Sequence, residues 1–238
     1  MKAVIIAGGA GTRLRPLTYV VPKCMLPVGG KPLLERTVKY LRTYGFSDFV
    51  VCVAYLKKQI IDAFGDGSDL GVKIQYAEAE GPLGTAGQLK TAEKYIDDDF
   101  LALNGDVVTS LNVTRLLTTH KERDGTGVIA LKKYEVRIPY GYVTTEHTSL
   151  IKNFSEKPTL QFLANAGFYV FKKKIFDYIP SRKVCSLETE VFPEMIKKGE
   201  KIYSYYEDAY WNDVGTMVDF EKVNDEFLSN AAVKLYQE

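Results

Sequence analysis

Hydrophobic and polar positions follow two different periods along the first half of the chain. Short apolar or alternating runs predict strands at residues 4–7, 49–54, 72–77 and 100–103. Residues at helical spacing lie between them: Leu34, Val38 and Leu41 predict a helix that starts near Pro32 and ends at Gly45. Further helical segments are expected at 59–64 and within 84–95. Strands that alternate with helices predict βαβ units and a largely parallel sheet.

The pattern changes after residue 126, where strand-like segments predominate. Strands are expected at 127–131 and 167–171, a hairpin pair at 142–145 and 149–154, and helices at 187–198 and 217–228. This region predicts an insertion of β structure laid over the sheet. No linker rich in Pro, Gly or Ser interrupts the chain, so we expect one domain over 1–238. No hexapeptide repeat of the β-helix type occurs, so we expect no C-terminal β-helix.

Composition and charge narrow the classes of function. Hydrophobic residues make up 46% of the 238 residues, yet no apolar run approaches the roughly 18 residues of a membrane span. A net charge of +1 provides no basic field for nucleic acid. Cys24, Cys52 and Cys185 are odd in number and widely separated, which indicates a reducing compartment rather than disulfides or zinc. We therefore expect a cytoplasmic protein that binds neither membrane nor nucleic acid.

A glycine-rich turn follows the first strand. Gly8, Gly9 and Gly11 let the backbone approach a ligand, and their N–H groups suit an anion. The cations Arg13, Arg15 and Lys23 come next, so the segment predicts a polyphosphate cradle. The alternative is a turn that only tightens the connection between strand and helix. The dinucleotide pattern G-x-G-x-x-G fails, because Leu14 occupies its third glycine, and the P-loop pattern is absent.

Two carboxylates are candidates for a metal site. Asp106 ends a buried strand in Leu103-Asn-Gly-Asp, and ligands of open α/β sheets bind beyond such strand ends. Mg²⁺ prefers one or two carboxylates together with phosphate oxygens. The alternative is that Asp106 caps the helix expected near Asn112. Asp213 precedes the helix expected from Met217, so a capping role is open there as well.

From Met1 to about Phe227, the chain resembles the sugar-1-phosphate nucleotidyltransferases, the NDP-sugar pyrophosphorylases. The segments that carry the resemblance occur in the family's order: 8–18, Pro22-Lys23, Lys31-Pro32, 83–86, 104–106, Tyr140-Gly141, 156–158, 165–167 and 211–216. The resemblance implies a Rossmann-like α/β nucleotidyltransferase fold. This fold has a mixed, mostly parallel central sheet flanked by helices, with a small β insertion for sugar binding.

The resemblance also implies a reaction: NTP and a sugar 1-phosphate give NDP-sugar and pyrophosphate by direct, Mg²⁺-assisted, in-line displacement. Residues 1–125 would mainly bind the nucleotide and 126–238 the sugar phosphate. The implied nucleotide site comprises Ala7, Gly8, Gly9, Gly11, Thr12, Arg13, Lys23, Gly84, Thr85 and Asp106. The implied sugar-phosphate site comprises Tyr140, Gly141, Glu156, Lys157 and Asn165. Asp106 and Asp213 would bind Mg²⁺, and the implied catalytic residues are Arg13, Lys23, Asp106, Lys157 and Asp213.

The identity of the substrates rests on two segments. Residues 82–87 and 186–193 are most similar to the mannose-1-phosphate guanylyltransferase branch, which implies GTP. Thymidylyl and uridylyl transfer to glucose 1-phosphate are the alternatives, and Glu78 or Glu80 is a candidate to contact the base. A non-catalytic sugar-nucleotide-binding regulatory subunit and a dinucleotide-dependent oxidoreductase are alternatives of other classes. A homo-oligomer stays open.

Overall fold

A seven-stranded sheet forms the centre of the computed structural model, which describes residues 1–181 and 183–229. Its order is β12-β8-β11-β6-β1-β4-β5, and β11 alone runs antiparallel to both of its neighbours. The strands are β1 (Ala3–Ile6), β4 (Asp48–Val53), β5 (Lys73–Glu78), β6 (Phe100–Asn104), β8 (Gly127–Arg137), β11 (Thr159–Phe171) and β12 (Ile202–Tyr206). The expected mixed, mostly parallel sheet is confirmed.

Helices cover both faces of the sheet because alternate strand residues point to opposite sides. Ala3 and Ile5 pack in one core cluster with residues of α1 (Leu33–Thr43), α2 (Lys57–Phe64) and α4 (Val113–Glu122). Val4 and Ile6 pack in a second cluster, with α3 (Gly84–Thr91) and α5 (Phe192–Lys197). The sequence expectations for these elements agree within a few residues. No helix in the described part of the chain is long and apolar enough to cross a bilayer.

A third apolar cluster lies beside the sheet and supports the turns that follow β1. Leu14, Leu26 and Leu33 pack there against Val108, Val214 and Val223, the last from α6 (Met217–Leu228). Short strand pairs belong to the same region: β2 (Pro27–Val28) with β3 (Lys31–Pro32), and β7 (Val107–Thr109) with β13 (Trp211–Asp213). Arg13 and Lys23 are thereby tied to residues from the far end of the chain.

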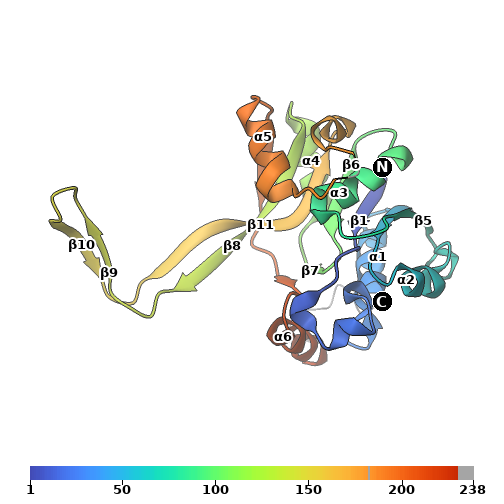
Figure 1. The fold of residues 1–238 in the computed structure, drawn as a ribbon, viewed down its shortest axis with the longest axis horizontal. Helices are drawn as coiled ribbons and strands as arrows, with labels where there is room; N and C mark the ends of the chain where they lie inside the picture. The colour runs from blue at the N-terminus through green and yellow to red at the C-terminus, as the bar shows by residue number, and fades with distance from the viewer. Residues whose placement is uncertain (182, 230–238) are drawn as a thin grey trace.

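The inserted β structure does not lie over the sheet as the sequence predicted. Instead, β8 and β11 run past the sheet edge as a two-stranded ribbon, and β9 (Tyr142–Thr145) pairs with β10 (Ile151–Ser155) at its tip (Figure 1). We call residues 132–165 the arm. The expected strand ends at 131 and 167 were wrong, because both strands continue through residues 132–137 and 159–165, which are mostly exposed and form no buried apolar run.

Candidate functional site

The glycine loop after β1 is held by close packing on α3. The Gly8 N–H donates to Gln88 Oε1 at 2.7 Å, and a Cβ at Gly8 would lie 2.7 Å from that same oxygen. Gly11 has φ +58°, where only glycine is comfortable, and its Cβ would lie 2.9 Å from Thr18 Cγ2. A Cβ at Gly9 would meet nothing within 4 Å. The loop therefore presents backbone to open space at Gly9 and is anchored on both sides of it.

A cleft of about 250 Å³ opens at the carboxyl ends of β1 and β6. It is lined by Ile6, Ala7, Gly9, Gly11, Thr12, Arg13, Lys23, Cys24, Thr85, Gln88, Asn104, Gly105, Asp106 and Gly215. Most of the nucleotide-site residues expected from the sequence meet here. Gly8 lies behind the lining, and Gly84 precedes Thr85 at the start of α3. Arg15 is outside the lining and lies over the Tyr19 ring, 4.8 Å from its centroid.

Two of the charged side chains in the cleft are paired with each other. The Lys23 ammonium donates to Asp106 Oδ2, and both side chains are largely shielded from solvent. Beside them, Asn104 Oδ1 is a buried acceptor with no hydrogen-bond partner among the described residues. A buried acceptor without a partner costs about 1–3 kcal/mol. A ligand donor or a water molecule entering the cleft would relieve that cost.

The second aspartate reaches the same cleft through the short β7–β13 pair. Asp213 lies opposite Val107 in the antiparallel register, and the Val214 N–H donates to the Asp106 carbonyl at 2.9 Å. The side chains of Asp213 and Arg13 both approach Gly215, which lines the cleft. A Cβ on it would lie 3.1 Å from Asp213 Oδ2 and 3.4 Å from Arg13 Nη2. Two aspartates more than a hundred residues apart in sequence thus lie at one wall of the cleft.

The capping alternatives for both aspartates are wrong. Asn112 caps α4, because its side chain accepts from the Arg115 N–H at 3.1 Å. Thr216 and Asp219 form a reciprocal capping box at the start of α6. Neither Asp106 nor Asp213 begins a helix, so capping occupies neither carboxylate, and Asp106 is paired with Lys23 instead. Two carboxylates of this kind are hard oxygen donors and fit Mg²⁺, which completes its shell with phosphate oxygens and water.

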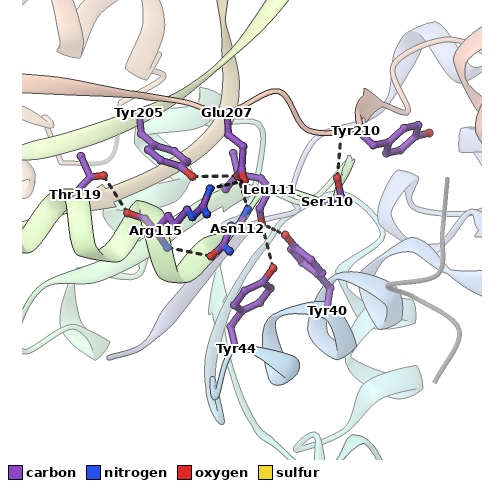
Figure 2. A network of polar contacts seen from close by, with 10 residues as sticks. All are labelled: Tyr40, Tyr44, Ser110, Leu111, Asn112, Arg115, Thr119, Tyr205, Glu207 and Tyr210. Atoms are coloured by element: carbon purple, nitrogen blue, oxygen red, sulfur yellow. Dashed lines mark hydrogen bonds and ion pairs between the residues drawn. The ribbon is translucent and has the colours of Figure 1, made fainter.

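A polar network fixes the segment that leads into β13 (Figure 2). Glu207 Oε2 accepts from the Asn112 N–H at 2.7 Å and from the Tyr205 hydroxyl at 3.1 Å. The Tyr210 N–H donates to Ser110 Oγ at 3.0 Å. These contacts tie residues 205–210 to the loop that follows β7. They hold β13 in register with β7 and so place Asp213 beside Asp106.

Asn165, at the base of the arm, is the expected sugar-phosphate residue that hydrogen bonds link to the cleft lining. Its Nδ2 donates to the Tyr169 hydroxyl at 2.8 Å, and that hydroxyl lies 3.4 Å from Glu188 Oε1. The Thr85 hydroxyl, in the cleft lining, donates to Glu188 Oε2 at 2.7 Å. Glu188 was not expected as a site residue, nor were Gln88 and Asn104. For Glu188 a signal existed, since it lies in the 186–193 segment already noted.

The other four expected sugar-phosphate residues lie toward the far end of the arm. Gly167 packs against Asn104 at the cleft, and Lys157 precedes it by ten residues of mostly extended chain. At about 3.3 Å per residue, Lys157 lies roughly 25–30 Å from the cleft. Tyr140, Gly141 and Glu156 lie at the same end of the arm, with Glu156 Oε1 3.9 Å from the Lys157 ammonium. The structure does not bring these four residues to the cleft of their own chain.

Cys24 is the one cysteine in the cleft lining. Burial raises the pKa of Cys24 to about 12, so its thiol stays protonated at neutral pH. The thiolate, not the thiol, is the nucleophile. The cleft therefore offers cations, carboxylates and backbone N–H groups rather than an activated sulfur.

Comparisons with known proteins agree with this cleft. A family model described as nucleotidyl transferase matches residues 2–230. The chain is 37% identical to mannose-1-phosphate guanylyltransferase of Mycobacterium tuberculosis, over 98% of this chain and 66% of that protein. It is 35% identical to UTP–glucose-1-phosphate uridylyltransferase of Synechocystis sp., over 92% and 61% respectively. The chain therefore spans slightly less than two thirds of the length of these curated relatives. The crystal structure of HddC from Yersinia pseudotuberculosis complexed with GMP-PN superposes with a TM-score of 0.74 and 28% identity, over 95% of this chain and 99% of that one.

Proposed function

This chain belongs to the nucleotidyl transferase family, and from that membership and its cleft we propose that it is a sugar-1-phosphate nucleotidyltransferase. The proposed reaction transfers a nucleoside monophosphate from NTP to a sugar 1-phosphate and releases pyrophosphate. The observation that carries the proposal is the meeting of the glycine loop, Arg13 and Lys23 with Asp106 and Asp213 at one cleft.

The proposed reaction requires neutralisation of the charges on its two anionic substrates and needs no protein nucleophile. A phosphate oxygen of the sugar 1-phosphate, already anionic at neutral pH, attacks the α-phosphorus of the NTP. The bond from the α-phosphorus to the bridging oxygen breaks, and pyrophosphate leaves with the electron pair. Two anions must approach in line, which requires positioning and fixed positive charge. The cleft supplies those features, while Cys24 stays a neutral thiol.

Each group in the cleft has a proposed task. The backbone around Gly9 binds the triphosphate, and Arg13 stabilises the departing β- and γ-phosphates. Lys23 leaves its pairing with Asp106 to hold the α-phosphate or the incoming phosphate. Asp106 and Asp213 would hold Mg²⁺, which when bound screens the charges of the two reacting anions. Gly84 and Thr85 lie against the base at the start of α3.

The sugar phosphate is assigned to the second half of the chain. Asn165 and Glu188 lie beside the cleft, and we assign contacts with the sugar hydroxyls to them. Tyr140, Gly141, Glu156 and Lys157 complete the proposed site, with Lys157 on the sugar phosphate as a mobile point charge. The two subsites correspond to the halves 1–125 and 126–238.

GTP and mannose 1-phosphate are the substrates we propose. The name of the M. tuberculosis relative and the guanine nucleotide named with HddC support this pair. UTP and glucose 1-phosphate are the second candidate, supported by the name of the Synechocystis relative. A reducing, cytoplasmic location belongs to the same proposal, because Cys24, Cys52 and Cys185 are free thiols.

The test is a pyrophosphate-release assay with Mg²⁺ across five nucleoside triphosphates and a panel of sugar 1-phosphates. We expect turnover that requires both substrates and is fastest with GTP and mannose 1-phosphate. Arg13→Ala should lower the rate by about 100-fold or more, as expected for a lost transition-state contact. Arg15→Ala is the matched control, because Arg15 stacks on Tyr19 outside the cleft. No turnover with any pair, or equal rates for the two variants, would contradict the proposal.

A further inference from the structure

The arm is an amphipathic ribbon whose apolar face is uncovered. Cross-strand pairing puts Tyr134 opposite Phe162 and Val136 opposite Leu160 on one face. The Tyr134 and Phe162 ring centroids lie 5.5 Å apart. The other face is mostly polar, with Leu163 as an apolar member: Gln161 Nε2 donates there to Glu135 Oε1 at 2.7 Å. Sheets acquire such alternation when one face packs and the other meets water, yet Phe162 is 50% and Tyr134 44% exposed.

The exposed area is too large for a monomer to leave bare. More than half of the exposed large apolar side chains in the described residues belong to the arm: Tyr134, Tyr140, Tyr142, Val143, Leu150, Ile151, Phe154, Leu160, Phe162 and Leu163. At about 200 Å² for each side chain when fully exposed, they present on the order of 1,000 Å². Monomers rarely expose apolar patches beyond about 300–600 Å². A standard interface buries about 800 Å² per partner.

The arm cannot cover its own cleft without breaking its pairing. The ladder is continuous from Thr159–Arg137 to Asn165–Leu131, where the ribbon joins the central sheet. Figure 1 shows it leading away from the body of the chain. Lys157 is therefore held roughly 25–30 Å from the cleft by the length of the strand. A second copy of the chain would supply both a cover for the apolar face and a cleft within reach of Lys157.

Symmetry makes such an exchange reciprocal. Two copies related by a two-fold axis would match each arm to the other's cleft.

The tip of the arm is already shaped as a binding turn. Lys157 has φ +45°, a conformation that non-glycine residues rarely adopt and that clusters at ligand sites. A Cβ at Gly141 would lie 2.7 Å from Phe154 Cζ and 3.1 Å from Glu156 Oε2. Glycine at 141 thus lets Phe154 and Glu156 fold closely over the backbone beside Lys157.

We propose that two copies of the chain associate through their arms, and that each arm carries Glu156 and Lys157 to the cleft of the other copy. The inference rests on the proposed function, because it takes these two residues as ligands of the sugar phosphate. Each complete site would then combine Arg13, Lys23, Asp106 and Asp213 of one copy with the arm of its partner copy.

Subunit complementation tests this directly. Arg13→Ala and Lys157→Ala chains with different affinity tags are co-expressed, and the mixed dimer is isolated through both tags. If each arm serves the other copy's cleft, the cleft of the Lys157→Ala chain receives the intact arm of the Arg13→Ala chain. One of the two sites is then complete, so we expect about half of the wild-type rate per dimer. If each arm instead serves the cleft of its own chain, neither chain has both Arg13 and Lys157. The mixed dimer would then be as inactive as each variant alone. That result, or failure of the two chains to co-purify, would overturn the inference.

The outcomes separate the inference from the proposed function. If both variants are inactive and the mixed dimer is too, the site residues stand and the exchange of arms is wrong. If the Lys157→Ala homodimer keeps full activity, the inference is wrong, while the roles of Arg13 and the cleft are untouched. If the wild type itself releases no pyrophosphate, the proposed function fails, and the oligomeric state still tests the arm.

Light scattering after size-exclusion chromatography measures the oligomeric state. The wild type should be a dimer. Phe162→Glu, on the apolar face of the arm, should make the protein a monomer and lower its activity although Arg13 and Lys157 are intact. Thr159→Glu is the matched control on the other face, where it lies opposite Arg137, and it should stay dimeric. Both side chains are exposed, so circular dichroism should show the same fold for both variants. A monomeric wild type, or a dimeric Phe162→Glu variant, would overturn the proposal.

Discussion

Gly84→Ala is predicted to be among the most damaging single-methyl changes at the cleft. Gly84 has φ +69° at the start of α3, and a Cβ there would lie 2.4 Å from the Cys185 carbonyl oxygen. That carbonyl accepts from the Ala86 N–H at 3.0 Å and the Gly87 N–H at 3.2 Å. It therefore takes the place of a side-chain cap for the first turn of the helix. A methyl group must displace it.

The expected loss of stability is the sum of two terms. Holding alanine in the left-handed region costs about 1–2 kcal/mol. Weakening two hydrogen bonds adds about 0.5–1.5 kcal/mol for each bond. We expect the free energy of unfolding to fall by about 2–4 kcal/mol, because the two terms are not fully additive. For a chain of this size that corresponds to a Tm lower by roughly 5–15 °C.

Thermal and urea unfolding of Gly84→Ala and wild type measure this directly. Gly81→Ala is the matched control in the same loop, because a Cβ at Gly81 would meet nothing within 4 Å. The control should stay within about 0.5 kcal/mol of the wild type. Equal stability of the two variants would refute the packing argument. A loss of NTP affinity without a loss of stability would show that Gly84 serves the ligand alone.

Three further predictions concern the cleft and its support. Asp106→Asn and Asp213→Asn should each lower kcat/KM by about 100-fold or more, and the double variant should be little worse because the two act as one unit; fully multiplicative losses in pyrophosphate release would contradict a shared metal. Cys24→Ala should keep the rate within a few-fold, because burial raises the pKa of that thiol to about 12; an inactive, folded variant would restore the thiol as a candidate nucleophile. Hydrogen bonds from Lys174, Thr126 and Tyr178 lower the pKa of Glu200 from 4.5 to about 2. The stability that these hydrogen bonds provide is complete above about pH 4.5 and is lost as the pH falls toward 2. The wild type should therefore have a higher Tm than Glu200→Gln at neutral pH, and this difference should shrink across that window. A Tm difference that does not change with pH would contradict the lowered pKa.

The local chemistry of the first strand and its loop could be predicted from sequence. The apolar run of β1, the glycines and the cations lie within 23 residues, so their proximity needs no long-range information. Asp106 could be expected at the cleft because it ends the neighbouring buried strand. The local cation pattern did not separate Arg13, which enters the cleft, from Arg15, which turns away onto Tyr19; the family resemblance did, since it implied Arg13 and not Arg15. That difference depends on the short helical turn at Thr12–Leu14.

Long-range pairing accounts for most of what the sequence did not predict. The pair β7–β13 joins two three-residue strands about a hundred positions apart, and neither is long enough to show a period. Strand β12 was missed because its Ile-Tyr-Ser-Tyr-Tyr run is half-exposed at the sheet edge. The direction of the arm was missed because Tyr134 lies between two charged residues and Phe162 between Gln161 and Leu163, and only register shows that Tyr134 and Phe162 share a face.

Transfer of the nucleotidyl group within this cleft is tested most directly by following a label placed on the α-phosphorus of GTP. With mannose 1-phosphate and Mg²⁺, we predict that label enters NDP-sugar in an amount equal to the pyrophosphate released. No label should remain on the denatured protein, and Arg13→Ala should stop the transfer. Label bound covalently to the chain, or label released as free nucleoside monophosphate without consumption of the sugar phosphate, would contradict direct displacement at this site.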